Sequence, residues 1–221
     1  MNNNLTELVF ILDRSGSMGG LESDTIGGFN SMLEEQKEGC GDVLLSTILF
    51  DDKIEFLHDR VDIKTVEKLT RNDYRVGGCT ALLDALGNAI NHIDKVQKNS
   101  PESIRPGKTM FIITTDGLEN SSHEYTYASI KKLVEQKKEG SHWEFIFLGA
   151  NMDAISAAAD IGISADRASN YHSDSKGTEV NYRALSRAVS CMRACKEASA
   201  CGAALESWDE EIVKDYSRRK K

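Results

Sequence analysis

The sequence predicts an α/β domain built on an open, doubly wound and mostly parallel sheet with helices on both faces. Runs rich in β-branched and aromatic residues alternate along the chain with stretches of helical periodicity, which is the order expected of βαβ units. The run VFIL at residues 9–12 is continuously apolar, as in a parallel strand that is covered on both faces. A very short connection between the second and third runs predicts one antiparallel edge strand.

Six segments are predicted to form the strands of this sheet. They are Glu7–Leu12, Val43–Phe50, Lys53–Val61, Thr109–Thr115, Trp143–Gly149 and a short sixth strand near Ala168–Tyr171. Only Asp51 and Asp52 join the second segment to the third, which is too short for a parallel crossover and predicts a hairpin. We expect the two carboxylates of this turn to accept hydrogen bonds from local backbone N–H groups.

Helices are predicted between the strands. Residues 81–97 place apolar side chains on one stripe at helical spacing, formed by Leu82, Leu86, Ala89, Ile93 and Val96. Ile130, Leu133 and Val134 form a shorter stripe after the fourth strand, and a long helix is predicted after the sixth. On that last helix, Cys191 and Cys195 share a stripe with small residues and are predicted to pack rather than to bind metal.

The 221 residues are expected to form one domain. Its predicted extent is 1–200, with a core at about 5–170 and a strand and helix extension, and residues 201–221 are expected to be a helical or flexible tail. A net charge of −8 argues against a nucleic-acid partner. No apolar run approaches the roughly 20 residues of a membrane helix, so no membrane association is predicted, and the sequence indicates no oligomeric state.

The cellular compartment is predicted to be the cytoplasm. The first residues, MNNNLTEL, show neither the basic nor the apolar part of a secretory leader. The five cysteines are an odd number without a paired CxxC motif, which is typical of a reducing compartment.

Oxygen-bearing side chains occur at the ends of two predicted strands and in one turn that precedes a predicted helix. Asp13, Ser15 and Ser17 come directly after the first strand, Thr80 lies in a glycine-rich turn before a helix, and Asp116 ends the fourth strand. Because the carboxyl ends of parallel strands share one edge of the sheet, these five side chains are expected to converge there. Two carboxylates and three hydroxyls suit Mg²⁺, with Mn²⁺ or Ca²⁺ as alternatives, and suit zinc or copper poorly.

The Asp-x-Ser-x-Ser motif of Asp13, Ser15 and Ser17, the single Thr80 and the Asp116-Gly117 pair together resemble the metal-ion-dependent adhesion site of the von Willebrand factor type A (VWA) family. The similarity covers residues 5–170 and is nearest to stand-alone intracellular bacterial members, some of them linked to tellurium resistance and stress responses. It implies a Rossmann-like sheet. It also implies that Ser15, Ser17 and Thr80 coordinate a cation directly and that Asp13 and Asp116 hold it directly or through water. The cation then captures a carboxylate from a protein partner.

This sequence departs from the family pattern at Cys79, where a smaller residue usually precedes the threonine; we expect it to be a small filler. Glu119, Asn120 and His123 follow Asp116 closely and are weaker candidates for the rim of the site. Asp84 lies one helical turn after Thr80, and the sequence leaves open whether it supports the site or is a surface acid.

Two functions other than a non-enzymatic binding module are compatible with parts of this sequence. A metal-dependent phosphohydrolase could use Asp13 as its nucleophile, but enzymes of the haloacid dehalogenase type usually carry a second acid two residues later, where this chain has Ser15. Dinucleotide binding is disfavoured because the first turn lacks a GxGxxG motif. The sequence therefore predicts a cation-dependent protein-binding module that is not an enzyme.

Overall fold

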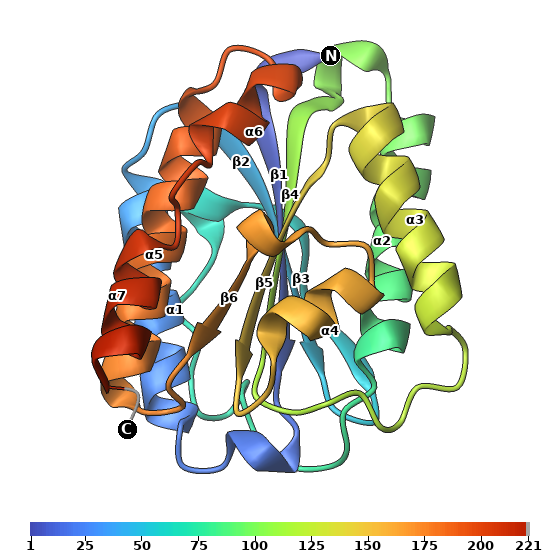
Figure 1. Ribbon diagram of the computed structural model, residues 1–221. Helices are drawn as coiled ribbons and strands as arrows, with labels where there is room; N and C mark the ends of the chain where they lie inside the picture. Colours follow the sequence, from blue (N-terminus) through green and yellow to red (C-terminus); the bar gives the residue numbers. More distant parts are fainter. Residues whose placement is uncertain (220–221) are drawn as a thin grey trace.

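The computed structural model describes residues 1–219, and within them a six-stranded sheet forms the centre of the molecule (Figure 1). The strand order is β3-β2-β1-β4-β5-β6, and every neighbouring pair is parallel except β2 and β3. The predicted α/β class, the mostly parallel sheet and the antiparallel edge strand are therefore confirmed. The strands are β1 (Asn2–Asp13), β2 (Asp42–Phe50), β3 (Ile54–Asp62), β4 (Pro106–Thr115), β5 (Glu144–Ala150) and β6 (Ala168–Tyr171).

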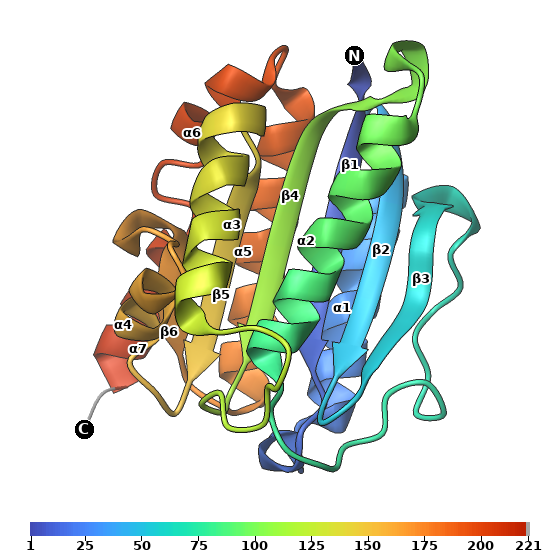
Figure 2. The same ribbon diagram turned by 90° about the vertical axis from the view of Figure 1, so that its right-hand side faces the viewer.

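Helices cover both faces of the sheet, so that the molecule has three layers (Figures 1 and 2). One face carries α1 (Glu22–Lys37), α5 (Ser175–Ala194), α6 (Cys201–Ala204) and α7 (Glu210–Arg219), and the other carries α2 (Leu82–Asn99), α3 (Tyr127–Ser141) and α4 (Ala154–Asp160). Two apolar cores result, one on each side of the sheet. This arrangement leaves the carboxyl edge of the sheet to the connecting loops.

Two strands begin earlier than the sequence predicted. β1 begins at Asn2 rather than Glu7, through a polar segment that is mostly exposed and lacks an apolar pattern. β4 begins at Pro106 rather than Thr109. A proline is tolerated at the first residue of a strand because that residue does not have to donate a backbone hydrogen bond to the neighbouring strand. The two extensions pair with each other at Asn2 and Pro106, so each depends on a partner distant in sequence.

The helix α2 agrees closely with its predicted stripe. Leu82, Leu86, Ala89 and Ile93 are buried against the sheet, whereas Val96 is only half-buried. At the end of the helix the buried position is taken by Gln97, whose side chain donates hydrogen bonds to Thr109 and Glu7. The polar end of the stripe therefore meets a polar part of the sheet.

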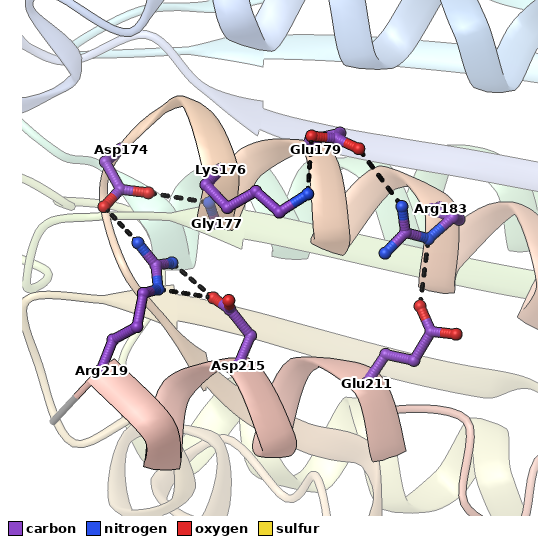
Figure 3. A network of polar contacts seen from close by, with 8 residues as sticks. All are labelled: Asp174, Lys176, Gly177, Glu179, Arg183, Glu211, Asp215 and Arg219. Atoms are coloured by element: carbon purple, nitrogen blue, oxygen red, sulfur yellow. Dashed lines mark hydrogen bonds and ion pairs between the residues drawn. The ribbon is translucent and has the colours of Figure 1, made fainter.

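The C-terminal segment packs beside α5 and the edge strand β6 (Figure 1). Trp208 and Ile212 are buried there, and ion pairs link α7 to α5 and to the turn before it (Figure 3).

The packing predicted for Cys191 is wrong, because that residue is exposed. Cys195 lies just past the end of α5, is partly buried and packs against the core on that side of the sheet, as predicted. Among residues 1–219, no helix is both long and apolar enough to cross a membrane.

Candidate metal centre

The candidate site lies where the order of the strands reverses in the sheet. β1 has β2 on one side and β4 on the other, and the loops after β1 and β4 leave the sheet at neighbouring points, since Leu12 pairs with Thr114. Ligands of doubly wound sheets bind in the crevice at such a switch point. The register therefore sets Asp13 and Asp116 beside each other, although they are far apart in sequence.

Asp13 ends β1 and is fully buried, and both of its carboxylate oxygens are held. Oδ1 accepts a hydrogen bond from the backbone N–H of Ser15 at 2.7 Å, and Oδ2 accepts one from the Thr115 hydroxyl at 2.5 Å. The backbone carbonyl of Asp13 accepts a hydrogen bond from the hydroxyl of the buried Tyr74. These three contacts fix the start of the loop, and neither Thr115 nor Tyr74 was among the predicted site residues.

A chain of short contacts continues from Asp13 through the two serines to the other carboxylate. The hydroxyls of Ser15 and Ser17 lie 3.0 Å apart, and the Ser17 hydroxyl donates to Asp116 Oδ1 at 2.5 Å. Ser15 is extended and directly precedes a single 3₁₀ turn, Gly16–Met18. That tight turn brings the alternate serines to the same side of the loop.

Thr80 joins this cluster across Gly117. A methyl group placed on Gly117 would lie 3.1 Å from the Ser17 hydroxyl, 3.2 Å from the Thr80 hydroxyl and 4.0 Å from the Ser15 hydroxyl. Three hydroxyls thus border a space that the missing side chain of glycine leaves open. Thr80 itself is buried. The structure brings all five predicted residues together, and their donor set fits a hard divalent cation.

The electrostatics of the cluster favour a bound positive charge. Burial raises the pKa of Asp13 and of Asp116, and the hydroxyls around them contribute no cationic charge. Arg14 follows Asp13 directly but turns to the hairpin, where it pairs with Asp51 at 3.0 Å and Glu55 at 2.5 Å. Nowhere in the described chain, this site included, does a group of three or more His, Cys, Asp or Glu residues form that could hold a metal. The hydroxyls are therefore essential to this candidate site.

The loop after β4 is attached to the start of α2 by the carboxylate of Glu119 and the amide of Asn120. Asn120 exchanges two hydrogen bonds with the backbone of Thr80, at 2.9 and 3.0 Å. Glu119 accepts from the backbone N–H groups of Leu83, Ser121 and Ser122. Both were weak candidates for the rim, and both hold the Thr80 turn in place.

Asp84 is neither a surface acid nor a neighbour of the cluster. It is buried and accepts hydrogen bonds from the backbone N–H groups of His123, Glu124 and Tyr125, at 2.8, 2.9 and 2.9 Å. His123 is an exposed residue of that loop.

The filler role predicted for Cys79 is wrong, because its side chain is exposed beside Thr80. The hairpin role predicted for Asp51 is confirmed, since it accepts from the backbone of Lys53 at 2.7 Å.

The chain matches no protein-family model and no curated protein sequence. It is similar in structure to a von Willebrand factor type A protein from Catenulispora acidiphila, with a TM-score of 0.54 and 14% identity over 82% of this chain and 42% of that one. The pilus adhesin SpaC from Lactobacillus rhamnosus GG gives a TM-score of 0.63 and 12% identity, over 84% of this chain and 30% of its own.

A third similar structure is that of proximal thread matrix protein 1 from the mussel byssus, with a zinc-occupied metal-ion-dependent adhesion site. Its TM-score is 0.58 at 14% identity, over 84% of this chain and 46% of that one. The chain thus spans less than half the length of each of these three structures. At these identities the similarity concerns the fold alone: the chain has the fold of a von Willebrand factor type A domain.

Proposed function

We propose that this protein is a divalent-cation-dependent binding module whose metal-ion-dependent adhesion site captures an acidic side chain of a protein partner. The observation that carries the proposal is the convergence of Asp13, Ser15, Ser17, Thr80 and Asp116 around the space left by Gly117. The zinc-occupied site of the mussel protein supports it, because a domain of the same fold holds a metal at the site of this name.

The chemistry of the five residues suggests which cation they would hold. Mg²⁺ is our first choice, with Mn²⁺ or Ca²⁺ as alternatives, because all five donors are oxygen atoms. Asp13 and Asp116 would balance its two positive charges. The hydroxyls of Ser15, Ser17 and Thr80 would supply neutral ligands, so that the bound cation attracts one further carboxylate. When bound, the metal thus supplies an electrophilic point of attachment.

We also propose that the protein is not an enzyme. A phosphohydrolase of the haloacid dehalogenase type would carry a second acid two residues after its nucleophile, whereas the residue two positions after Asp13 is Ser15, whose hydroxyl lies 3.0 Å from that of Ser17. A cytoplasmic location is proposed as well, supported by five cysteines that are all free thiols and by the resemblance to stand-alone bacterial proteins of stress-response systems.

The proposal is tested by titrating Mg²⁺, Mn²⁺ and Ca²⁺ separately into metal-stripped protein in a calorimeter. We expect saturable binding at one site in the unchanged chain and none in the double variant Asp13→Ala/Thr80→Ala. The matched control is Glu139→Ala, which removes an exposed acid from the last turn of α3, away from the candidate site, and should leave the binding unchanged. Equal binding by all three proteins would mean that the ion sits elsewhere.

The partner side of the proposal and the enzymatic alternative each need a separate measurement. Capture of acidic peptides should require metal and should disappear in the double variant, because the partner's carboxylate attaches through the ion. Turnover of an aryl phosphate by the unchanged chain that is lost in Asp13→Asn would favour the phosphohydrolase instead.

A further inference from the structure

An exposed leucine stands directly beside the candidate metal centre. Leu118 follows Gly117, and its side chain is 64% exposed. Neighbouring Cα atoms are about 3.8 Å apart, so Leu118 begins one peptide unit from the residue that faces the hydroxyls of Ser17 and Thr80. A group that approaches the cation from solvent therefore passes close to this leucine.

The loop that carries Leu118 is held by hydrogen bonds both after and before this residue. Beyond it, Glu119 and Asn120 are bonded to the start of α2, and Asp84 holds the backbone of residues 123–125. Before it, the Gly117 N–H donates to the Thr115 hydroxyl at 3.2 Å. A loop whose backbone is fixed in this way loses little conformational freedom when a partner covers it, which favours binding.

The surroundings of the site are apolar on one side and charged on the other. Tyr127 and Ile155, which are 44% and 45% exposed, start the helices that follow β4 and β5 at the same edge of the sheet as Leu118. On the β2–β3 side lie Asp51 and Asp52, with Arg14 paired to the first of them. Single exposed apolar residues are ordinary, but here three lie in segments that follow strands at the same edge of the sheet as the candidate site.

We propose that Leu118 is a specificity determinant: the partner segment carries a large apolar side chain within about two residues of the Asp or Glu that binds the metal. Two residues of extended chain span about 7 Å, so a side chain within two positions of the bound carboxylate can reach Leu118, whose Cα lies one step of about 3.8 Å from that of Gly117. The apolar side chain of the partner packs on Leu118, on the side of β4 and β5. This inference rests on the proposed function, because it describes what surrounds the captured carboxylate.

The test uses an array of short peptides, each with a central Asp or Glu and systematically varied residues on both sides. Labelled protein is applied in Mg²⁺ and, in parallel, in EDTA. We expect Mg²⁺-dependent binding that is strongest where a large apolar residue lies within two positions of the acid. The variant Leu118→Ser should still bind acidic peptides but lose about tenfold of this preference, because the covered leucine contributes apolar burial.

The matched control is Ile104→Ser, which removes an exposed apolar side chain from the segment before β4, at the opposite end of the sheet. It should leave the peptide preference unchanged, and calorimetry should show that both variants still bind Mg²⁺. Metal-dependent binding without apolar preference, or a preference that survives Leu118→Ser, would overturn the inference and leave the proposed function standing. No metal-dependent binding to any acidic peptide would overturn both.

Discussion

At the scale of single residues, Gly117 decides whether the three hydroxyls can share a ligand. The change Gly117→Ala would place a methyl group 3.1 and 3.2 Å from the hydroxyls of Ser17 and Thr80, inside the space proposed for the ion. We expect Mg²⁺ affinity to fall at least about tenfold, equivalent to about 1.4 kcal/mol. Calorimetry measures it, with Gly77→Ala as the control, since a methyl group there meets no atom within 4 Å.

His58 provides a residue-scale test of how stability depends on pH. Burial lowers the pKa of His58 from its ordinary value of 6.5, although the nearby Asp73 acts in the opposite direction. Its Nδ1 atom is buried without a hydrogen-bond partner in the described structure. As pH falls below about 6.5, the unfolded chain takes up a proton at this position that the folded protein resists, so the free energy of unfolding decreases.

The expected consequence is a difference between the unchanged chain and His58→Gln. Between about pH 7.5 and pH 5.5 the urea midpoint of the unchanged chain should fall further than that of the variant. Carboxylates with raised pKa values, such as Glu7, act in both proteins and cancel in this comparison. Parallel pH profiles would show that His58 has no part in the effect.

At the scale of secondary-structure elements, Asp84 couples α2 to the loop that presents Asp116. The change Asp84→Ala leaves three backbone N–H groups without their acceptor, and we expect the free energy of unfolding to fall by about 2–3 kcal/mol. Hydrogen exchange should accelerate at residues 123–125 in particular. A uniform loss of protection across the molecule, without preference for this loop, would argue against the coupling.

The elements also show what local sequence could predict and what it could not. The β2–β3 hairpin and the α2 stripe depend on neighbouring residues, so both could be inferred from spacing. The five oxygen donors could be placed together because parallel strands share an edge. The roles of Asp84, Glu119 and Tyr74 could not, because each bonds backbone groups whose positions depend on tertiary contacts rather than on residue type. The early start of β1 likewise depends on a distant strand.

At the scale of the whole molecule, α7 is attached to the domain both by ion pairs and by apolar burial. Arg219 pairs with Asp174 and Asp215, and Arg183 pairs with Glu211 (Figure 3). Beneath these partly exposed pairs, Ile212 is almost fully buried in the core shared by α1, α5 and the sheet. The expected contributions of the ion pairs and of the buried isoleucine to the free energy of unfolding indicate which of them mainly attaches the helix.

Exposed ion pairs contribute at most about 1 kcal/mol each, whereas truncating a buried isoleucine to alanine costs about 2–5 kcal/mol. We therefore expect Arg219→Ala to lower the free energy of unfolding by less than about 1 kcal/mol, and Ile212→Ala to lower it by at least about 2 kcal/mol. Urea unfolding measures both.

Arg219 is a better probe of the ion pairs than Asp174, because Asp174 also caps α5 through the Gly177 N–H. High salt should reproduce the effect of Arg219→Ala but not that of Ile212→Ala, since only the ion pairs are screened. A larger loss from Arg219→Ala than from Ile212→Ala would instead make the charge network the main attachment of α7.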